Sequence, residues 1–176
     1  GFKDFIFRMA EGNEVNTQSN YLVTNIGIIT YDYLVLAMGS TNNFFGMKNV
    51  AENAMPMKSL TQALDLRSLI LQNMERALVQ TSNNQKYLNF VIAGGGPTGV
   101  ETAGALCELK RHVLPNDYPE LNFSHARIIL VEAGPSLLAG MSSFASQKAL
   151  DDLTEMGVEV LLNSAVIDYD GEKVTI

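Results

Sequence analysis

The sequence predicts an α/β fold in which helices wind around a parallel sheet. From residue 88 onward, short apolar runs alternate with helical patterns in the order strand, helix, strand, helix, strand. The runs at residues 88–93 and 127–132 are mostly apolar, which is typical of strands covered on both faces. A glycine-rich turn separates the first of these strands from the first helix. Together these features predict a doubly wound βαβαβ unit with a parallel sheet.

The first forty residues are predicted to be β-rich. The expected elements are strands at residues 2–7 and 21–24 and turns at residues 11–13 and 25–27. The run at residues 31–37 is almost continuously apolar and ends just before Gly39, which predicts a buried strand. Residues 40–57 contain small and polar residues and are expected to form an irregular connection.

Ser59 is a suitable N-cap, and the apolar spacing after it predicts a helix of some twenty residues that ends at Ser82-Asn83-Asn84. The helix that follows the glycine-rich turn is expected to run to Leu114 and to close at Pro115. A polar connection, residues 116–126, then leads to the second strand.

The second helix of the predicted unit spans residues 145–156, with Ser142 or Ser143 as its N-cap and Gly157 just past its end. A third strand follows at residues 158–162. The chain then carries two short strands at residues 166–168 and 173–176, joined by the hairpin turn signal Asp170-Gly171.

Composition excludes several classes of protein. Twelve Lys and Arg against nineteen Asp and Glu give a net charge of −7, which disfavours nucleic acid and anionic membranes as partners. No apolar run approaches the roughly 18 residues of a membrane helix, and the start shows no signal-peptide pattern. The single cysteine, Cys107, excludes an internal disulfide, and its helical apolar position predicts a buried, inert thiol.

The glycine-rich turn has the spacing of a dinucleotide fingerprint between a strand and a helix. Gly94 permits the tight turn, Gly96 lets the backbone approach a pyrophosphate, and Gly99 allows the helix to pack on the sheet. Pro97 suits the first helical position, and the N–H groups around Gly96 to Thr98 face the expected phosphates. The alternative is a glycine-rich turn without a ligand.

Glu132 ends the second strand, where a carboxylate can accept both ribose hydroxyls of the adenosine half. It would repel a 2′-phosphate by roughly 4 kcal/mol at 4 Å, which predicts NADH rather than NADPH as the ligand. Glu132 follows Gly99 by 33 residues rather than the usual twenty or so, and we attribute the excess to the insertion at residues 116–126. The alternative is a solvated glutamate at a strand end.

Glu101 is expected in the first turn of the fingerprint helix, where the helix dipole favours a carboxylate whatever its function. The functional interpretation is that Glu101 faces the nicotinamide end of the ligand. His112 and His125 have no carboxylate or thiol cluster at ligand spacing, so surface or capping roles are expected and no metal site is predicted.

The segment Gly94-Gly95-Gly96-Pro97-Thr98-Gly99-Val100-Glu101, followed by Ala103 and Leu106, resembles the two-dinucleotide flavoprotein reductases, and most of all the type II NADH dehydrogenases. These are single-subunit NADH:quinone oxidoreductases. Residues 31–39, residues 43–46 and residues 132–138 resemble other parts of the same family. The resemblance covers nearly the whole chain.

The resemblance implies a Rossmann-type NADH-binding domain at residues 49–176, truncated at its C-terminal end, and a β-rich remnant of a flavin domain at residues 1–48. It implies that Glu101 orients the nicotinamide against the flavin. The implied cofactor-binding residues are Gly94, Gly95, Gly96, Pro97, Thr98, Gly99, Glu132, Ala133 and Gly134. The family's Ala-Thr-Gly reads Ala37-Met38-Gly39 here, and its N-terminal flavin fingerprint is absent, so we expect a fragment whose FAD pocket is mostly missing.

The implied reaction of the intact protein is hydride transfer from NADH to FAD, followed by electron transfer to a membrane quinone. We expect that protein to lie on the cytoplasmic face of the membrane, and the chain alone to bind NADH with little catalysis. Exposed strand edges predict a dimer or higher assembly of the chain. Two alternatives remain: a reductase with a ferredoxin, rubredoxin, peroxide or disulfide partner, and a non-catalytic dinucleotide-binding module.

Overall fold

The computed structural model describes residues 4–80 and 84–176. The chain forms two compact units, Gly1–Thr41 and Asn42–Ile176. The assignment of residues 1–48 to a flavin domain and of residues 49–176 to an NADH domain stays a prediction.

The first unit is a three-stranded antiparallel sheet in the order β1-β2-β3. Its strands are β1 (Gly12–Asn16), β2 (Tyr21–Thr24) and β3 (Gly27–Thr30). The predicted strand at residues 21–24 and the turn after it are confirmed. Thr24 supports that turn by donating its hydroxyl to Gly27 O at 2.6 Å.

The turn predicted at residues 11–13 is wrong, because β1 begins at Gly12. The chain reverses later, after Asn16, whose side-chain oxygen accepts from the N–H groups of Gln18 and Ser19 at 3.1 and 2.8 Å. An Asx turn therefore replaces the glycine turn that the composition suggested.

Two further strand predictions in this unit are wrong. Residues 31–37 form no strand, and Tyr33 and Val35 are 94% and 84% exposed. Residues 4–7 form no strand either, while residues 2 and 3 lie outside the described part of the chain. A strand exists through its ladder of hydrogen bonds, and neither segment pairs with another strand of the described residues. Apolar composition by itself does not supply that partner.

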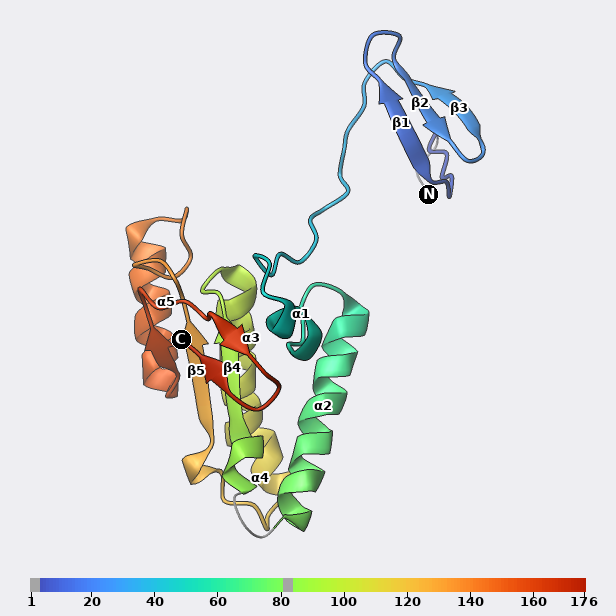
Figure 1. Cartoon of the computed structure of the whole chain (residues 1–176). Helices are drawn as coiled ribbons and strands as arrows, with labels where there is room; N and C mark the ends of the chain where they lie inside the picture. Colours follow the sequence, from blue (N-terminus) through green and yellow to red (C-terminus); the bar gives the residue numbers. More distant parts are fainter. Residues whose placement is uncertain (1–3, 81–83) are drawn as a thin grey trace. The chain divides into compact units, whose positions relative to one another are not determined.

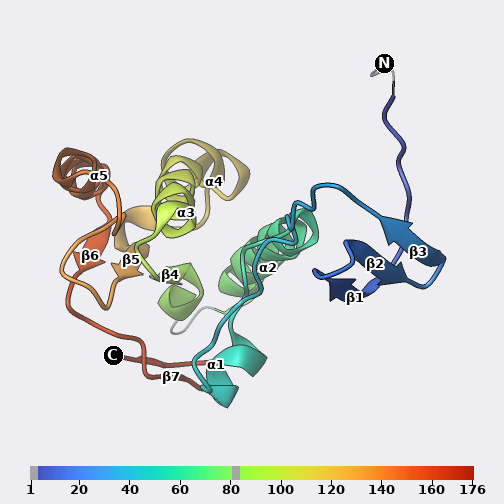
Figure 2. The same ribbon diagram turned by 90° about the horizontal axis from the view of Figure 1, so that it is seen from above.

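The second unit contains the predicted parallel sheet, with strand order β4-β5-β6. Its strands are β4 (Asn89–Ala93), β5 (Arg127–Val131) and β6 (Glu159–Leu161). Helices α3 (Pro97–Glu108) and α5 (Ser143–Met156) form the two crossovers and pack on the same side of the sheet, as Figure 2 shows. The βαβαβ fold class is confirmed.

Caps define α5 as the sequence predicts. The Ser142 hydroxyl accepts from Ala145 N–H at 3.2 Å, and Gly157 ends the helix at φ +91°. Because a residue with a side chain rarely adopts that φ, glycine suits this position.

The helix after the glycine-rich turn does not close at Pro115. It continues from α3 through a π-helical turn, η2 (Leu109–Val113), into α4 (Leu114–Asp117). The N–H of Leu114 donates to Leu109 O, five residues back, instead of four. Pro115 then lies near the start of α4, within this continuous helical segment, and without an N–H it donates no hydrogen bond to the preceding π-helical turn. The connection that follows contains a short 3₁₀ turn, η3 (Phe123–His125).

Helix α2 (Leu60–Val79) begins as predicted, with a capping box. The Ser59 hydroxyl accepts from Gln62 N–H at 3.2 Å, and the Gln62 side chain accepts from Ser59 N–H at 3.1 Å. The helix ends earlier than expected, at Val79. Residues 82 and 83 of the predicted end lie outside the described part of the chain, which resumes in the 3₁₀ helix η1 (Asn84–Leu88).

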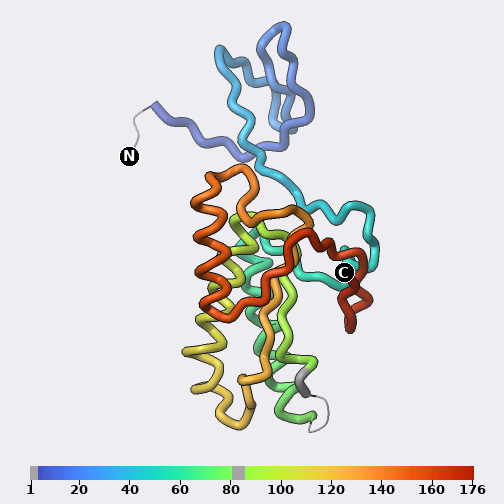
Figure 3. The backbone as a smooth tube through the Cα atoms, turned by 90° about the vertical axis from the view of Figure 1, so that its left-hand side faces the viewer, coloured from blue at the N-terminus to red at the C-terminus, as the bar shows by residue number. Residues whose placement is uncertain are grey.

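A helix that the sequence did not predict, α1 (Lys48–Asn53), lies within the expected irregular connection. Its N-cap position, Met47, makes no side-chain cap, so the usual start signal is missing. It packs beside the C-terminal hairpin, β7 (Asp168–Tyr169) and β8 (Val174–Thr175), as Figure 3 shows. The side chain of Asn53 donates to Tyr169 O at 3.5 Å, a contact that no local pattern contains.

The hairpin turn itself is confirmed. The Asp170 carboxylate accepts from the N–H groups of Glu172 and Lys173 at 2.8 and 2.7 Å, and Gly171 has a φ of +95°. Both features are typical of Asp-Gly turns.

One buried cluster of the second unit is formed by the parallel sheet, the crossover helices α3 and α5, the loop after β5 and one residue of α2; Figure 1 labels α2, α3 and α5 and the strands β4 and β5. Its buried members are Ile70, Ala103, Leu106, Cys107, Ile128, Leu130, Leu137, Leu153 and Val158. Cys107 is 4% exposed, as predicted, and burial raises the pKa of its thiol. Among the described helices, none has the length and apolar character needed to cross a bilayer.

Candidate dinucleotide site

The glycine-rich turn lies at the carboxyl end of β4, between that strand and α3. Gly94 has a φ of +105°, and its N–H donates to Val131 O on β5 at 2.8 Å. A Cβ atom on Gly99 would overlap the carbonyl group of Gly94. The first glycine is therefore required by backbone conformation and the last by the close approach of helix and strand.

Gly96 differs from these two, because a Cβ atom at this position would have no heavy atom within 4 Å. Its φ of −72° suits any residue, so neither conformation nor packing within the chain requires glycine here. Pro97 is the first helical residue, and the N–H groups of the first turn have no acceptor one turn back. The space beside Gly96 is the kind that a ligand fills.

Gly95 is buried, and both its N–H and its carbonyl form hydrogen bonds with the segment after β5. Its N–H donates to Glu132 Oε2 at 2.6 Å, and its carbonyl accepts from Leu138 N–H at 2.8 Å. An added Cβ atom would lie 2.6 Å from Leu137 Cδ2 and 3.1 Å from the Glu132 side-chain stem. The sequence gives no reason for a glycine at this position. In the structure the reason is steric, because Leu137 and Glu132, which follow β5, leave no room for a Cβ atom.

Glu132 follows β5 directly and is partly buried. Besides accepting from Gly95, its carboxylate accepts from Gly134 N–H through Oε1 at 2.6 Å. Ala133 lies exposed between Glu132 and Gly134. The alternative interpretation of Glu132 as a solvated strand end is therefore wrong, because the carboxylate bridges two turns at the edge of the sheet.

Glu101 is exposed on α3, but the expectation that it lies in the first turn is wrong. Helix α3 begins at Pro97, which makes Glu101 its fifth residue, and the first turn contains no acidic side chain. The dipole effect fades within one turn, so it gives little reason for a carboxylate at this position.

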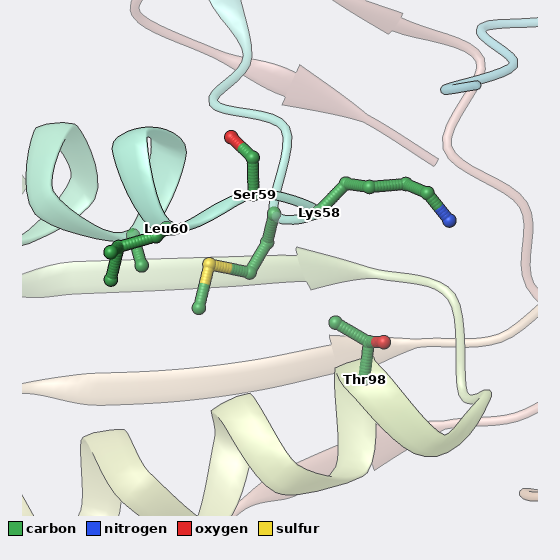
Figure 4. Close-up of a pocket in the computed structure, with 6 residues that line it drawn as sticks. Lys58, Ser59, Leu60 and Thr98 are labelled. Carbon is green, nitrogen blue, oxygen red and sulfur yellow. The ribbon is translucent and has the colours of Figure 1, made fainter. Parts of the chain in front are cut away.

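A cavity of about 360 Å³ lies where the N-terminal ends of α2 and α3 approach each other. Figure 4 shows Lys58 and Thr98 on opposite sides of it. The lining residues are Met57, Lys58, Ser59, Leu60, Ala63 and Thr98. Of these, only Thr98 belongs to the site that the sequence predicts. A usable signal exists: Lys58 precedes the N-cap of a 20-residue helix, where the dipole disfavours a cation.

The remaining candidates, Cys107, His112 and His125, are not part of the glycine-rich turn. Cys107 is in the core, and His112 is exposed on η2, where it approaches Glu108 at 3.4 Å. His125 is exposed in η3. Within residues 4–80 and 84–176, no three His, Cys, Asp or Glu side chains gather as a metal site would require.

The sequence profile of the pyridine nucleotide-disulphide oxidoreductases matches residues 5–176, and the chain belongs to this family. It is 38% identical over 148 residues to the type II NADH:quinone oxidoreductase Ndh of Mycobacterium tuberculosis, covering 83% of this chain and 32% of that protein. It is 36% identical over 162 residues to NdhA of the same organism, covering 90% and 34%. The chain therefore spans about a third of the length of these relatives.

Solved structures agree with this family assignment. The structure of NDH2 from Plasmodium falciparum in complex with NADH superposes with a TM-score of 0.78 at 26% identity, over 94% of this chain and 35% of that one. The sulfide:quinone oxidoreductase of Aquifex aeolicus, at 19% identity and a TM-score of 0.61, shares the fold. The resemblance to type II NADH dehydrogenases that the sequence indicated is confirmed.

Proposed function

We propose that residues 49–176 bind NADH, with the adenosine ribose at Glu132 and the pyrophosphate at residues 96–98. The observation that carries this proposal is the bridge from Glu132 to Gly95 and Gly134. A carboxylate offers about four acceptor sites, and the two N–H groups use two of them. Two acceptor sites remain for the two hydroxyls of an unmodified ribose. A 2′-phosphate would instead bring a second anion against the carboxylate.

Local charge supports the phosphate assignment. The N-terminal ends of α2 and α3 both border the cavity, neither has an acidic residue in its first turn, and Lys58 adds a cation. These groups make a positive region in a chain of net charge −7. Open space beside Gly96 lets the ligand reach the backbone there.

We propose that Glu101 acts at the nicotinamide end of the ligand. It is exposed one turn beyond the N–H groups of Gly96 and Thr98, and the helix dipole gives little reason for its presence. NADH supplies the hydride, and this side chain would orient the nicotinamide that carries it. In the intact protein Glu101 is our proposed catalytic residue.

We propose that the intact protein is an NADH:quinone oxidoreductase that uses FAD and lies on the cytoplasmic face of a membrane. Identity with the two mycobacterial enzymes favours quinone over the other acceptors. A dithiol partner chemistry gains no support from Cys107, which is buried. Residues 31–39, which resemble part of the flavin domain, form no strand in this chain, and Tyr33 and Val35 are 94% and 84% exposed. We therefore assign no flavin step to this chain.

We also propose that the chain self-associates through strand edges. The order β1-β2-β3 leaves one side of β1 and one of β3 without a strand among the described residues. Ile26 and Ile28 at the β2–β3 turn are 55% and 67% exposed. Unpaired edges with apolar side chains favour strand exchange. Light scattering at high concentration should report a dimer or larger species, and a strict monomer would contradict this.

The test of the binding proposal is calorimetric titration of the chain with NADH and with NADPH. We expect NADH to bind at least about tenfold more tightly, since the 2′-phosphate faces Glu132. Tighter binding of NADPH would refute the ribose assignment. In the intact protein, Glu101→Gln should lower NADH:quinone turnover, and unchanged turnover would favour a non-catalytic binding module.

A further inference from the structure

Both the backbone and the side chain of Glu132 are fixed by hydrogen bonds. Its N–H donates to Leu161 O on β6 at 2.8 Å, and its carbonyl accepts from Ser164 N–H at 2.9 Å. Both bonds fasten the residue to β6 and the segment after it. From this fixed base the side chain extends to the glycine-rich turn and to Gly134, with both N–H donors at 2.6 Å.

Gly95 is the residue of the turn that this carboxylate fixes. Its N–H is bound by Glu132, its carbonyl by Leu138 N–H at 2.8 Å, and its Cα faces Leu137, which is 1% exposed. The next residue, Gly96, has open space on the side where a Cβ would lie. The constrained peptide of Gly95 therefore directly precedes Gly96, the residue whose backbone we expect the ligand to approach.

We propose that Glu132 is a positioning residue for the phosphate turn, in addition to its proposed contact with ribose. By holding the Gly95 peptide, it sets the direction in which the N–H groups of Gly96 and Thr98 point. Three consecutive glycines would otherwise sample many conformations, because each lacks a Cβ. Only the ligand-binding test of this inference rests on the proposed function. The hydrogen bonds from Gly95 and Gly134 to Glu132 exist within the chain itself.

The positioning role and simple electrostatics predict opposite effects of removing the Glu132 charge on phosphate binding. A carboxylate near a phosphate repels it, so removing the charge should strengthen the binding of a phosphate compound that has no ribose. If Glu132 holds the turn in shape, removing it should weaken that binding instead. Inorganic pyrophosphate is a probe that distinguishes these two outcomes.

The first measurement needs no ligand. Amide hydrogen exchange and backbone NMR order parameters of the 176-residue chain would be compared for wild type, Glu132→Gln and Glu132→Asp. Glutamine has one acceptor oxygen for two N–H donors, and aspartate keeps the charge but is one methylene shorter. Glu155→Gln, an exposed carboxylate on α5, is the matched control for the lost charge.

We expect exchange at Gly95 to quicken on the order of tenfold or more in Glu132→Gln, which loses a charge-assisted bond. The N–H groups of Gly96 and Thr98 have no acceptor within the helix to protect them from exchange, so their mobility is measured as NMR order parameters, which should fall in both variants. A change confined to Gly95 and Gly134 would overturn the positioning role. Glu155→Gln should match wild type at all of these amides.

The second measurement is an NMR titration with inorganic pyrophosphate. We expect Glu132→Gln and Glu132→Asp to bind it several-fold more weakly than wild type and Glu155→Gln. Equal or tighter binding by Glu132→Gln would overturn the inference, since it identifies the carboxylate as a repulsive charge only. If wild type binds neither NADH nor pyrophosphate, the proposed function fails, while the NMR order parameters of Gly96 and Thr98 still decide the positioning role.

Discussion

The carbonyl group of Gly94 occupies the space that a Cβ atom on Gly99 would need. Gly94 begins the turn that follows β4, and Gly99 lies in the first turn of α3, so this contact sets how closely the helix approaches the strand. Backbone atoms form both sides of the contact and cannot rotate away as a side chain would. The fingerprint spacing is therefore a packing requirement of the fold as well as a signature of a ligand.

Gly99→Ala should destabilise the chain by about 3 kcal/mol, because α3 must move away from β4 to admit the methyl group. The matched control is Gly104→Ala in the same helix, where an added Cβ has no heavy atom within 4 Å. That substitution should stabilise by about 0.5–1 kcal/mol through helix propensity. Urea unfolding checks both, and equal stabilities of the two variants would contradict the assigned contact.

Gly96→Ala should fold like wild type, with an unfolding free energy within about 0.5 kcal/mol, because its φ of −72° and open surroundings admit alanine. We expect NADH to bind at least about tenfold more weakly, since the methyl group would fill the space proposed for the pyrophosphate. Calorimetric titration gives the affinity. Wild-type affinity in this variant would mean that the ligand does not approach Gly96.

Ser59→Ala should cost about 1 kcal/mol of stability, because it removes the acceptor for Gln62 N–H at the start of α2. Ser68→Ala is the control within the same helix. The Ser68 hydroxyl donates to Leu64 O, an interior back-bond that contributes little, so this change should be within about 0.5 kcal/mol of neutral. Thermal unfolding that shifts equally in both variants would argue against the capping box.

The bidentate pair between Arg127 and Glu159 should make stability depend on acid pH. Hydrogen bonds from Arg127, at 2.7 and 2.6 Å, lower the pKa of Glu159 from 4.5. A depressed pKa in the folded state contributes stability above the unfolded value, and that contribution is lost as pH falls through the folded value. Because both side chains are about half exposed, we expect at most a few-fold change in the unfolding equilibrium constant.

Urea unfolding of wild type and Glu159→Gln between about pH 5 and pH 3 measures this contribution. The variant should lose less stability over that range than wild type does. Arg127→Gln should flatten the same part of the profile, since it removes the partner. Identical profiles for wild type and both variants would show that the pair contributes nothing to stability.

Local chemistry explains which parts of the fold were predictable. The cap at Ser142, the left-handed Gly157 and the capping box at Ser59 involve residues within a few positions of one another. The same holds for the Asp170-Gly171 turn. Such features depend on backbone dihedrals and short-range hydrogen bonds, which a sequence pattern contains in full.

The failed predictions share the opposite property. Residues 31–37 look like a buried strand, yet burial requires neighbours, and Tyr33 is 94% exposed in this chain. Pro115 looks like a helix end, yet a π-helical turn with an N–H bond from Leu114 to Leu109 carries the helix past it. Helix α1 has no cap and packs beside the C-terminal hairpin, more than a hundred residues away along the chain.

The candidate site also combines features that the local sequence predicts with contacts that only the folded chain makes. The amino-acid order is enough to identify the glycine-rich turn and to favour an acid at the end of the following strand, because both follow from strand and helix periodicity. The bond from Gly95 to Glu132 joins residues 37 positions apart and exists only because β4 and β5 lie side by side. Lys58 and Thr98 likewise line one cavity only because the N-terminal ends of two helices approach each other in the folded chain. Contacts of this kind depend on the packing of distant segments, which no local pattern records.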